Sequence, residues 1–172
     1  LDVPVTGGTE GAKAGTLTLL VGGEADALER VRPLLEVIGG TIHHFGQVGR
    51  GQQVKAVNQV LVAGSYAAVA EAIALGERLD LPMDQVVEAL RGGAAGSWAL
   101  EHRAPGMLRG SYPLGFRLAL HHKDLGIALD AAESVQLELP ISHLVQQLEH
   151  DLMQKGYGDE DVSALHRRHG TK

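Results

Sequence analysis

The chain has 172 residues, of which 44% are apolar and only 3% aromatic, and it has no cysteine, so it can form one domain or two unequal ones without a disulfide scaffold. Its formal net charge is −6 and it has no long basic run, which argues against nucleic-acid binding. We expect no membrane span, because no stretch approaches the apolar length that one needs, and we expect no signal peptide, because the first residues lack its features.

The first 46 residues have the pattern of an α/β segment. Strands are predicted over 1–5, 16–21 and 41–45, and a helix over 24–38, where apolar residues recur at intervals of three and four. A turn rich in glycine follows the first strand. A strand, a helix and a strand with short connections indicate a crossover unit. Because three strands rarely complete a sheet and the chain opens in a strand without Met, we expect a fragment of a larger domain.

From about residue 51 the pattern becomes helical. A helix is predicted over 52–79, which is long for a globular protein, with Val54, Val57 and Leu61 facing the core. Two prolines and three glycines predict a loop with at most a short helix over 104–115. Shorter helices are predicted over 83–91, 116–135, 141–155 and 159–166. In the helix over 141–155, Ile141 and Leu144 are predicted to face the core. The chain is therefore expected to be mostly α, with the long helix as a bridge.

The segment with the most chemical content lies where a glycine-rich turn becomes the long helix. Gly49 and Gly51 precede Lys55, Asn58 and Gln59, and these three share one helix face because they stand at i, i+3 and i+4. A lysine and two amides on one face suit a site that moves a proton beside a bound polar ligand. The alternative is a solvent-facing stripe on the first turns of a helix.

Thr6, Gly7 and Gly8 follow the first predicted strand. Consecutive N–H groups without bulky side chains can form an anion-binding nest, which would hold a carboxylate. The alternative is an ordinary turn between a strand and a helix.

Lys123 follows two adjacent histidines in a predicted helix, and it could reach a cofactor or be an ordinary solvated lysine. His121 and His122 point about 100° apart, so they would not chelate one metal together. The sequence has no His-Glu-x-x-His and no cysteine, and we predict no metal site.

The order and spacing of the motifs carry more information than any one of them. Five motifs stand in order: Asp2-Val-Pro-Val-Thr-Gly-Gly8; Gly49-x-Gly51-x-x-x-Lys55-x-x-Asn58-Gln59; Gly96-Ser97-Trp98; Phe116 followed by Lys123-Asp124-Leu125; and Gly156-x-Gly158-x-x-Asp161-x-Ser163-Ala164. In this order they resemble the C-terminal part of the β-hydroxyacid dehydrogenases, the family of 3-hydroxyisobutyrate dehydrogenase and tartronate semialdehyde reductase. The resemblance spans essentially the whole chain.

The resemblance implies a fold and an activity. Residues 1–48 would be the last strands and helix of a Rossmann NAD(P)-binding domain, and 49–172 an all-helical domain of the 6-phosphogluconate dehydrogenase type. The implied reaction interconverts a small β-hydroxy acid and its semialdehyde, of the 3-hydroxyisobutyrate or 2-hydroxy-3-oxopropanoate type, with NAD or NADP as cofactor.

The resemblance also implies roles for single residues. Lys55 would be the general acid/base, and Lys123 would lie near the cofactor. Substrate-binding positions would be Thr6, Gly7, Gly8, Asn58, Gln59, Phe116 and Asp124. The family usually has Ser at position 6 and often has Asn at position 59, so Thr6 and Gln59 leave the substrate open.

Further expectations concern the whole protein. We expect a cytoplasmic enzyme that forms a homodimer or homotetramer through the long helix, with a small hydroxy acid or semialdehyde as its substrate. The chain alone lacks the phosphate-binding loop, so it should be inactive and bind the cofactor weakly. The rival hypothesis is a helical assembly or binding module without catalysis, and the presence of Lys55 argues against it.

Overall fold

The computed structural model describes residues 1–170, which form two compact units, Leu1–Gln59 and a second that begins at Val60. The division falls inside one long helix, α3 (Arg50–Arg78), whose first turns belong to unit 1. The predicted boundary between residues 48 and 49 concerns functional domains and stays a prediction.

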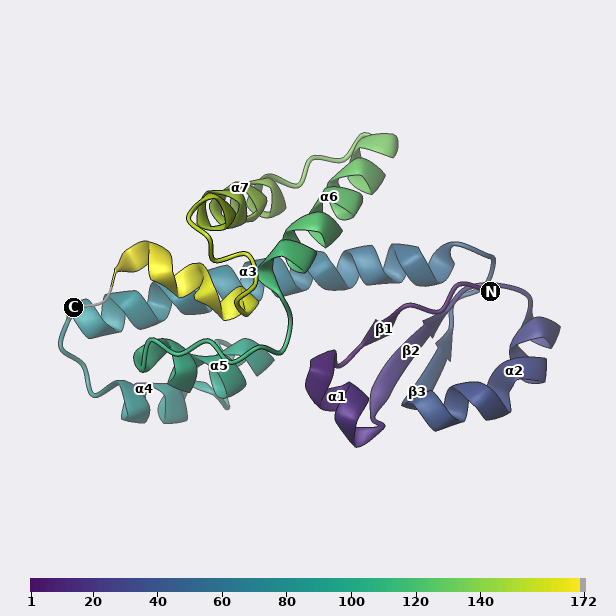
Figure 1. Ribbon diagram of the computed structural model, residues 1–172, viewed down its shortest axis with the longest axis horizontal. Helices are drawn as coiled ribbons and strands as arrows, with labels where there is room; N and C mark the ends of the chain where they lie inside the picture. The colour runs from purple at the N-terminus through teal and green to yellow at the C-terminus, as the bar shows by residue number, and fades with distance from the viewer. Residues whose placement is uncertain (171–172) are drawn as a thin grey trace. The chain divides into compact units, whose positions relative to one another are not determined.

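Unit 1 is a small sheet with two helices in addition to the start of α3 (Figure 1). Its elements are β1 (Val5–Thr6), α1 (Gly8–Ala14), β2 (Leu17–Val21), α2 (Ala25–Ile38) and β3 (Gly39–His44). The strand order is β1-β2-β3, with β1 antiparallel to β2 and β2 parallel to β3. Apolar side chains from β2 and α2 form the core, so the predicted crossover of strand, helix and strand is confirmed.

Two predictions for the first residues are wrong. β1 has only two residues, because Pro4 has no N–H to continue the ladder, and Asp2 pairs with Gly22 in an isolated bridge outside it. The glycine-rich turn contains the helix α1, which was not predicted. α1 packs against β2, where a Cβ on Gly11 would lie 3.2 Å from Leu17, so tertiary packing overrides the low helix propensity of its glycines.

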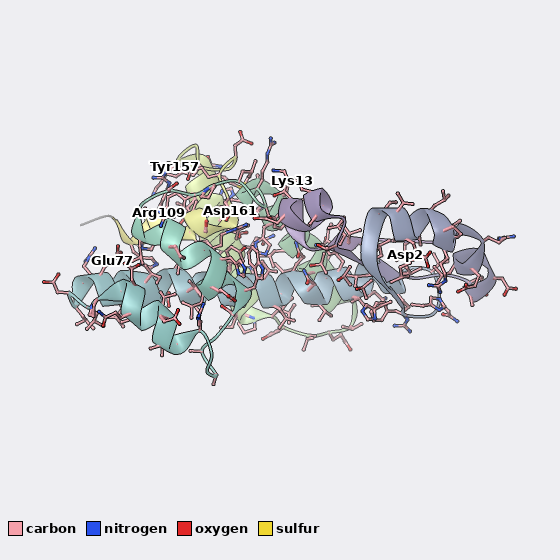
Figure 2. All side chains as sticks on the ribbon, turned by 90° about the horizontal axis from the view of Figure 1, so that it is seen from below. Asp2, Lys13, Glu77, Arg109, Tyr157 and Asp161 are labelled. Atoms are coloured by element: carbon pink, nitrogen blue, oxygen red, sulfur yellow. The ribbon has the colours of Figure 1, made fainter. Side chains whose placement is uncertain are left out.

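The start of α3 is fixed by a carboxylate from the beginning of the chain, Asp2 (Figure 2). Its Oδ1 accepts the N–H of Gly49 at 2.6 Å and its Oδ2 the N–H of Gln52 at 2.8 Å. The first turn of α3 has no acidic residue, so Asp2 supplies the negative charge that stabilises this helix end. Burial raises the pKa of Asp2, but the hydrogen bonds from Gly49 and Gln52 outweigh it, so the pKa is lower than the usual 3.8.

Close packing of glycines around this carboxylate leaves no room for a shift of the helix. A Cβ on Gly51 would collide with the carbonyl oxygen of Leu20 and lie 2.7 Å from Asp2 Oδ2. A Cβ on Gly22 would lie 2.8 Å from the nitrogen of Gly51. The first turn of α3 is therefore held directly against the end of β2.

We expect Asp2→Asn to lower the free energy of unfolding by about 1 kcal/mol at pH 7, because it loses one acceptor and places an amide donor against an N–H group. The pKa of Asp2 is lowered by folding, so its contribution is present above pH 3.8 and disappears as the pH falls through the folded-state value. Urea unfolding at pH 7 and at about pH 2 measures both effects. The control is Glu36→Gln, which changes an exposed carboxylate on α2. An equal loss of stability at both pH values would contradict the capping role.

Unit 2 is helical, and its elements pack around the remainder of α3 (Figure 1). They are α4 (Met83–Leu90), α5 (Trp98–Leu108), α6 (Leu118–Ser134), α7 (Pro140–Gln154) and the 3₁₀ helix η1 (Val162–His169). The core side of α3 presents two small residues and three larger ones, namely Ala63, Tyr66, Val69, Ala70 and Ile73. The prediction of a mostly α chain with one long helix is confirmed.

Several predicted details of the helices are wrong. Val57 and Leu61 are 62% and 69% exposed, and Ile141 and Leu144 are 63% and 52% exposed, so none of them is in the core. Helix α5 continues through the first part of the predicted loop, because burial of the residues around Pro105 stabilises it.

We expected no stretch of the chain to be long and apolar enough for a membrane span, and this expectation is wrong for α3. By length and composition alone, α3 is long and apolar enough to cross a membrane, although 44% of its most apolar window is buried inside the protein. A core helix has this composition when both of its faces are apolar.

Candidate functional site

The predicted site residues of unit 1 lie at the end of β1 and on the first turns of α3. Thr6 is the last residue of β1, and Gly7 and Gly8 form the turn into α1. Gly7 has a φ of +128° and Gly8 a φ of +63°, which are conformations that glycine adopts without strain. Two glycines are therefore required by the path of the backbone between β1 and α1.

A chain of side-chain hydrogen bonds links this turn to α3. The hydroxyl of Thr6 donates to Asn58 Oδ1 at 3.3 Å, and Asn58 Nδ2 donates to Gln59 Oε1 at 2.8 Å. Gln59 is only 1% exposed. Lys55 is half-buried and stands three residues before Asn58 on the same helix face. The structure thus brings Thr6, Asn58 and Gln59 together, although they are far apart in the sequence, with Lys55 on the adjoining turn of α3.

The three remaining predicted residues lie in unit 2. Phe116 is half-buried, and its ring meets the ring of His121 edge-on, with 5.8 Å between the centroids. On α6, Lys123 Nζ lies 2.8 Å from Asp124 Oδ1, and the Lys123 side chain is 62% exposed whereas that of Asp124 is 16% exposed. This exposed amine can contact an anionic group of a ligand. The roles assigned to these residues stay predictions.

A buried ionisable pair connects α6 with α7 behind Phe116. His121 Nδ1 lies 2.5 Å from Glu149 Oε1, and both side chains are fully buried. Burial raises the pKa of Glu149, and the hydrogen bond from His121 only partly opposes this. Glu149 Oε2 has no hydrogen-bond partner among residues 1–170. The contact between His121 and Glu149 therefore helps to hold α6 against α7. Within the part of the chain that the structure describes, no group of three potential metal ligands occurs.

Two carboxylates that organise these sites were not predicted in that role from the sequence. Asp2 was seen only as part of a motif, because its partners at the start of α3 are far along the chain. Glu149 stands at a helical position among polar residues, and nothing in the local pattern indicated that it is buried. The burial of Glu149 on α7 can be recognised only when its partner on α6, His121, is known.

Two family models match the chain in consecutive segments. The model for the NAD-binding domain of NADP-dependent 3-hydroxyisobutyrate dehydrogenase matches residues 49–168, and the model for the NAD-binding domain of 6-phosphogluconate dehydrogenase matches residues 1–46. The first match alone covers more than half of the chain.

Similar proteins are oxidoreductases. An NAD-dependent L-serine dehydrogenase of Pseudomonas aeruginosa is 41% identical and matches 97% of this chain but 58% of its own length. A 2-hydroxy-3-oxopropionate reductase of Escherichia coli is 40% identical and matches 96% of this chain and 56% of its own length. A solved structure of Mycobacterium tuberculosis 3-hydroxyisobutyrate dehydrogenase with L-serine has a TM-score of 0.89 at 32% identity, over 99% of this chain and 60% of that one.

The chain thus spans between half and two thirds of the length of the relatives it matches. The resemblance inferred from the five motifs is confirmed by the family models, which place the helical segment and the α/β segment in the same order. The chain belongs to the 3-hydroxyisobutyrate dehydrogenase family of β-hydroxyacid dehydrogenases.

Proposed function

We propose that this chain is the substrate-binding and helical part of an NAD(P)-dependent oxidoreductase that interconverts a small β-hydroxy acid and its semialdehyde. The observation that carries the proposal is the hydrogen-bond chain from Thr6 through Asn58 to Gln59, with Lys55 on the adjoining turn. Lys55, which can carry a proton, stands one turn before the residue that binds Thr6, and Thr6 leads into a turn suited to a carboxylate. The named substrates of the two relatives support the same substrate class, because each has a carboxylate and an oxygen on its β carbon.

The residues of unit 1 divide the work of the reaction. A nicotinamide cofactor, when bound, supplies or accepts the hydride. Lys55 gives a proton to the aldehyde oxygen during reduction and takes the hydroxyl proton during oxidation. Asn58, held in one orientation by Thr6 and Gln59, keeps the substrate oxygen in register with Lys55. The turn at Gly7 binds the substrate carboxylate through its N–H groups.

The residues of unit 2 complete the proposal. Phe116 flanks the substrate, and Asp124 contributes to its binding. Lys123 contacts the cofactor, since its amine remains largely exposed in the pair with Asp124. The proposed enzyme is cytoplasmic, and its partner is a small hydroxy acid or semialdehyde.

We expect Lys55→Met to lower kcat/KM by about 10²- to 10⁴-fold, because it removes the proton carrier while keeping the length of the side chain. The measurement is steady-state kinetics of the enzyme with a complete nucleotide-binding domain, using a panel of small hydroxy acids and semialdehydes with both cofactors. The matched control is Lys155→Met, which changes an exposed lysine at the end of α7. Turnover at the wild-type rate in Lys55→Met would remove Lys55 from the mechanism.

We also propose that the enzyme is a homodimer or a larger assembly built on it. The outer stripe is defined as Leu61, Ala68, Ala72, Leu75 and Leu79, and all five residues are exposed. The first four lie on α3 opposite its core face, and Leu79 follows the last residue of the helix. Leu61, Leu75 and Leu79 are 69%, 61% and 61% exposed, and stripe residues recur at intervals of three, four and seven. Such spacing is typical of a helix that packs against another helix.

The outer stripe is nearly symmetric about Ala68, since Leu61 and Leu75 stand seven residues to either side. Two copies related by a two-fold axis at Ala68 would run antiparallel, and Leu61 of one copy would face Leu75 of the other. The small side chain at the centre allows the two helices to approach closely. A second copy of this chain is therefore the occupant that fits the stripe.

We expect Leu75→Glu to convert the assembly to a smaller species, because a two-fold contact would bury two unpaired charges, each against Leu61 of the other copy. Size-exclusion chromatography with light scattering measures the mass, and circular dichroism checks that the helices remain. The control is Ile127→Glu on α6, where the side chain is 53% exposed outside the stripe. The dimer proposal is wrong if Leu75→Glu keeps the wild-type mass.

A further inference from the structure

We propose that Asp161 is a positioning residue that holds Phe116 in place for the substrate. Phe116 is the only aromatic residue among the positions assigned to the substrate, and its backbone lies in the connection between α5 and α6. The part of the proposal that concerns substrate rests on the proposed function. The part that concerns the backbone of Phe116 stands on the contacts of Asp161 alone.

Asp161, labelled in Figure 2, has a fully buried carboxylate. It receives contacts from three segments of unit 2. Its Oδ2 accepts the N–H groups of Gly115 and Phe116, each at 2.9 Å. Its Oδ1 accepts the N–H of Ser163 at 3.0 Å and the hydroxyl of Ser163 at 2.7 Å. The Nε of Arg103 lies 3.3 Å from the same oxygen. The two oxygens of a carboxylate can accept about four hydrogen bonds, so this group is saturated.

Backbone hydrogen bonds fix the same segment from the other side. The N–H of Val162 donates to the carbonyl of Phe116, and the N–H of Leu118 donates to the carbonyl of Glu160, both at 2.9 Å. Phe116 is thus held at its N–H by a side chain and at its carbonyl by the chain that follows Asp161. Phe116 is half-buried as a residue, and its ring meets the ring of His121 edge-on.

Arg103 provides the charge that a buried carboxylate requires. Its side chain is only 9% exposed, and its guanidinium lies 4.6 Å from the centroid of the Trp98 ring. Trp98 is 47% exposed and stacks on His102 with 4.5 Å between the centroids. Asp161→Asn would remove the negative charge that faces Arg103 and would replace one of the two acceptor oxygens by a donor NH2 group.

The Asp161 contacts link two motifs that the sequence places far apart, Phe116 and Gly156-x-Gly158-x-x-Asp161-x-Ser163. The apolar core of unit 2 is formed by other residues, including Ala70, Met107 and Leu125. We therefore expect the loss of the carboxylate to loosen the segment around Phe116 more than the fold as a whole.

The first test measures amide hydrogen exchange in the chain itself. In Asp161→Asn the amides of Gly115 and Phe116 should exchange about tenfold faster or more, while the amide of Ala70 in the middle of α3 changes little. The matched control is Asp159→Asn, because the Asp159 carboxylate stands two residues earlier and its side chain is 89% exposed. Wild-type exchange at Gly115 and Phe116 in Asp161→Asn would overturn the proposal. Should Asp161→Asn fail to fold, Ser163→Ala removes one contact of Oδ1 and should accelerate the same two amides to a smaller extent.

The second test asks whether Asp161 acts on the substrate through Phe116. In the enzyme with a complete nucleotide-binding domain, Asp161→Asn should raise KM for the hydroxy acid about tenfold and leave KM for the cofactor nearly unchanged. In the double variant with Phe116→Leu the two effects should not add, because both act on one contact. Additive effects would contradict the proposed route through Phe116. A wild-type enzyme that turns over no hydroxy acid would contradict the proposed function, and the exchange rates would still decide whether Asp161 holds Phe116.

Discussion

The carboxylate of Asp2 at the first turn of α3 is the interaction on which unit 1 depends. It binds the N–H groups of Gly49 and Gln52 where the helix begins, and the glycines around it leave no space for a different register. Because the helix is rigid from that point, the same contact determines where Lys55 and Asn58 lie relative to β1. The hydrogen bond between Thr6 and Asn58 then follows from the position of the helix. A helix cap therefore sets the geometry of the candidate acid/base site.

Unit 2 also contains a carboxylate that accepts hydrogen bonds from backbone N–H groups far away in the sequence. Asp161 also binds backbone N–H groups of a distant segment, and it is buried more deeply than Asp2, so it needs Arg103 as a counterion. In both units a carboxylate far along the chain satisfies N–H groups that have no partner in their own segment. Such contacts fix loops and helix ends, which helix propensity alone leaves free. The residues with proposed roles in substrate binding stand next to these fixed points.

The sequence predicted the main helices and the crossover unit because their signals are local. Periodic apolar residues identified α2, α3, α6 and α7, and β-branched residues identified β2. It could not tell which face of α3 is buried, because both faces are apolar, and the side with Leu61 was wrongly assigned to the core. Helix α1 and the end of α5 depend on packing against other elements, and the contacts of Asp2 and Glu149 join positions that no local pattern relates. The motif spacing identified the family, since spacing preserves three-dimensional relations that composition does not.

The central claim is that the capped start of α3 places Lys55 to exchange a proton with a hydroxy acid whose carboxylate lies at the turn of Gly7 and Gly8. A crystal structure of the enzyme with its complete nucleotide-binding domain, a nicotinamide cofactor and a small β-hydroxy acid tests this claim most directly. We predict that the β-oxygen of the acid lies within about 3 Å of Lys55 Nζ and that its carboxylate lies against the N–H groups of the turn. A hydroxy acid bound with its β-oxygen away from Lys55, and its carboxylate away from Thr6 and the two glycines, would contradict it.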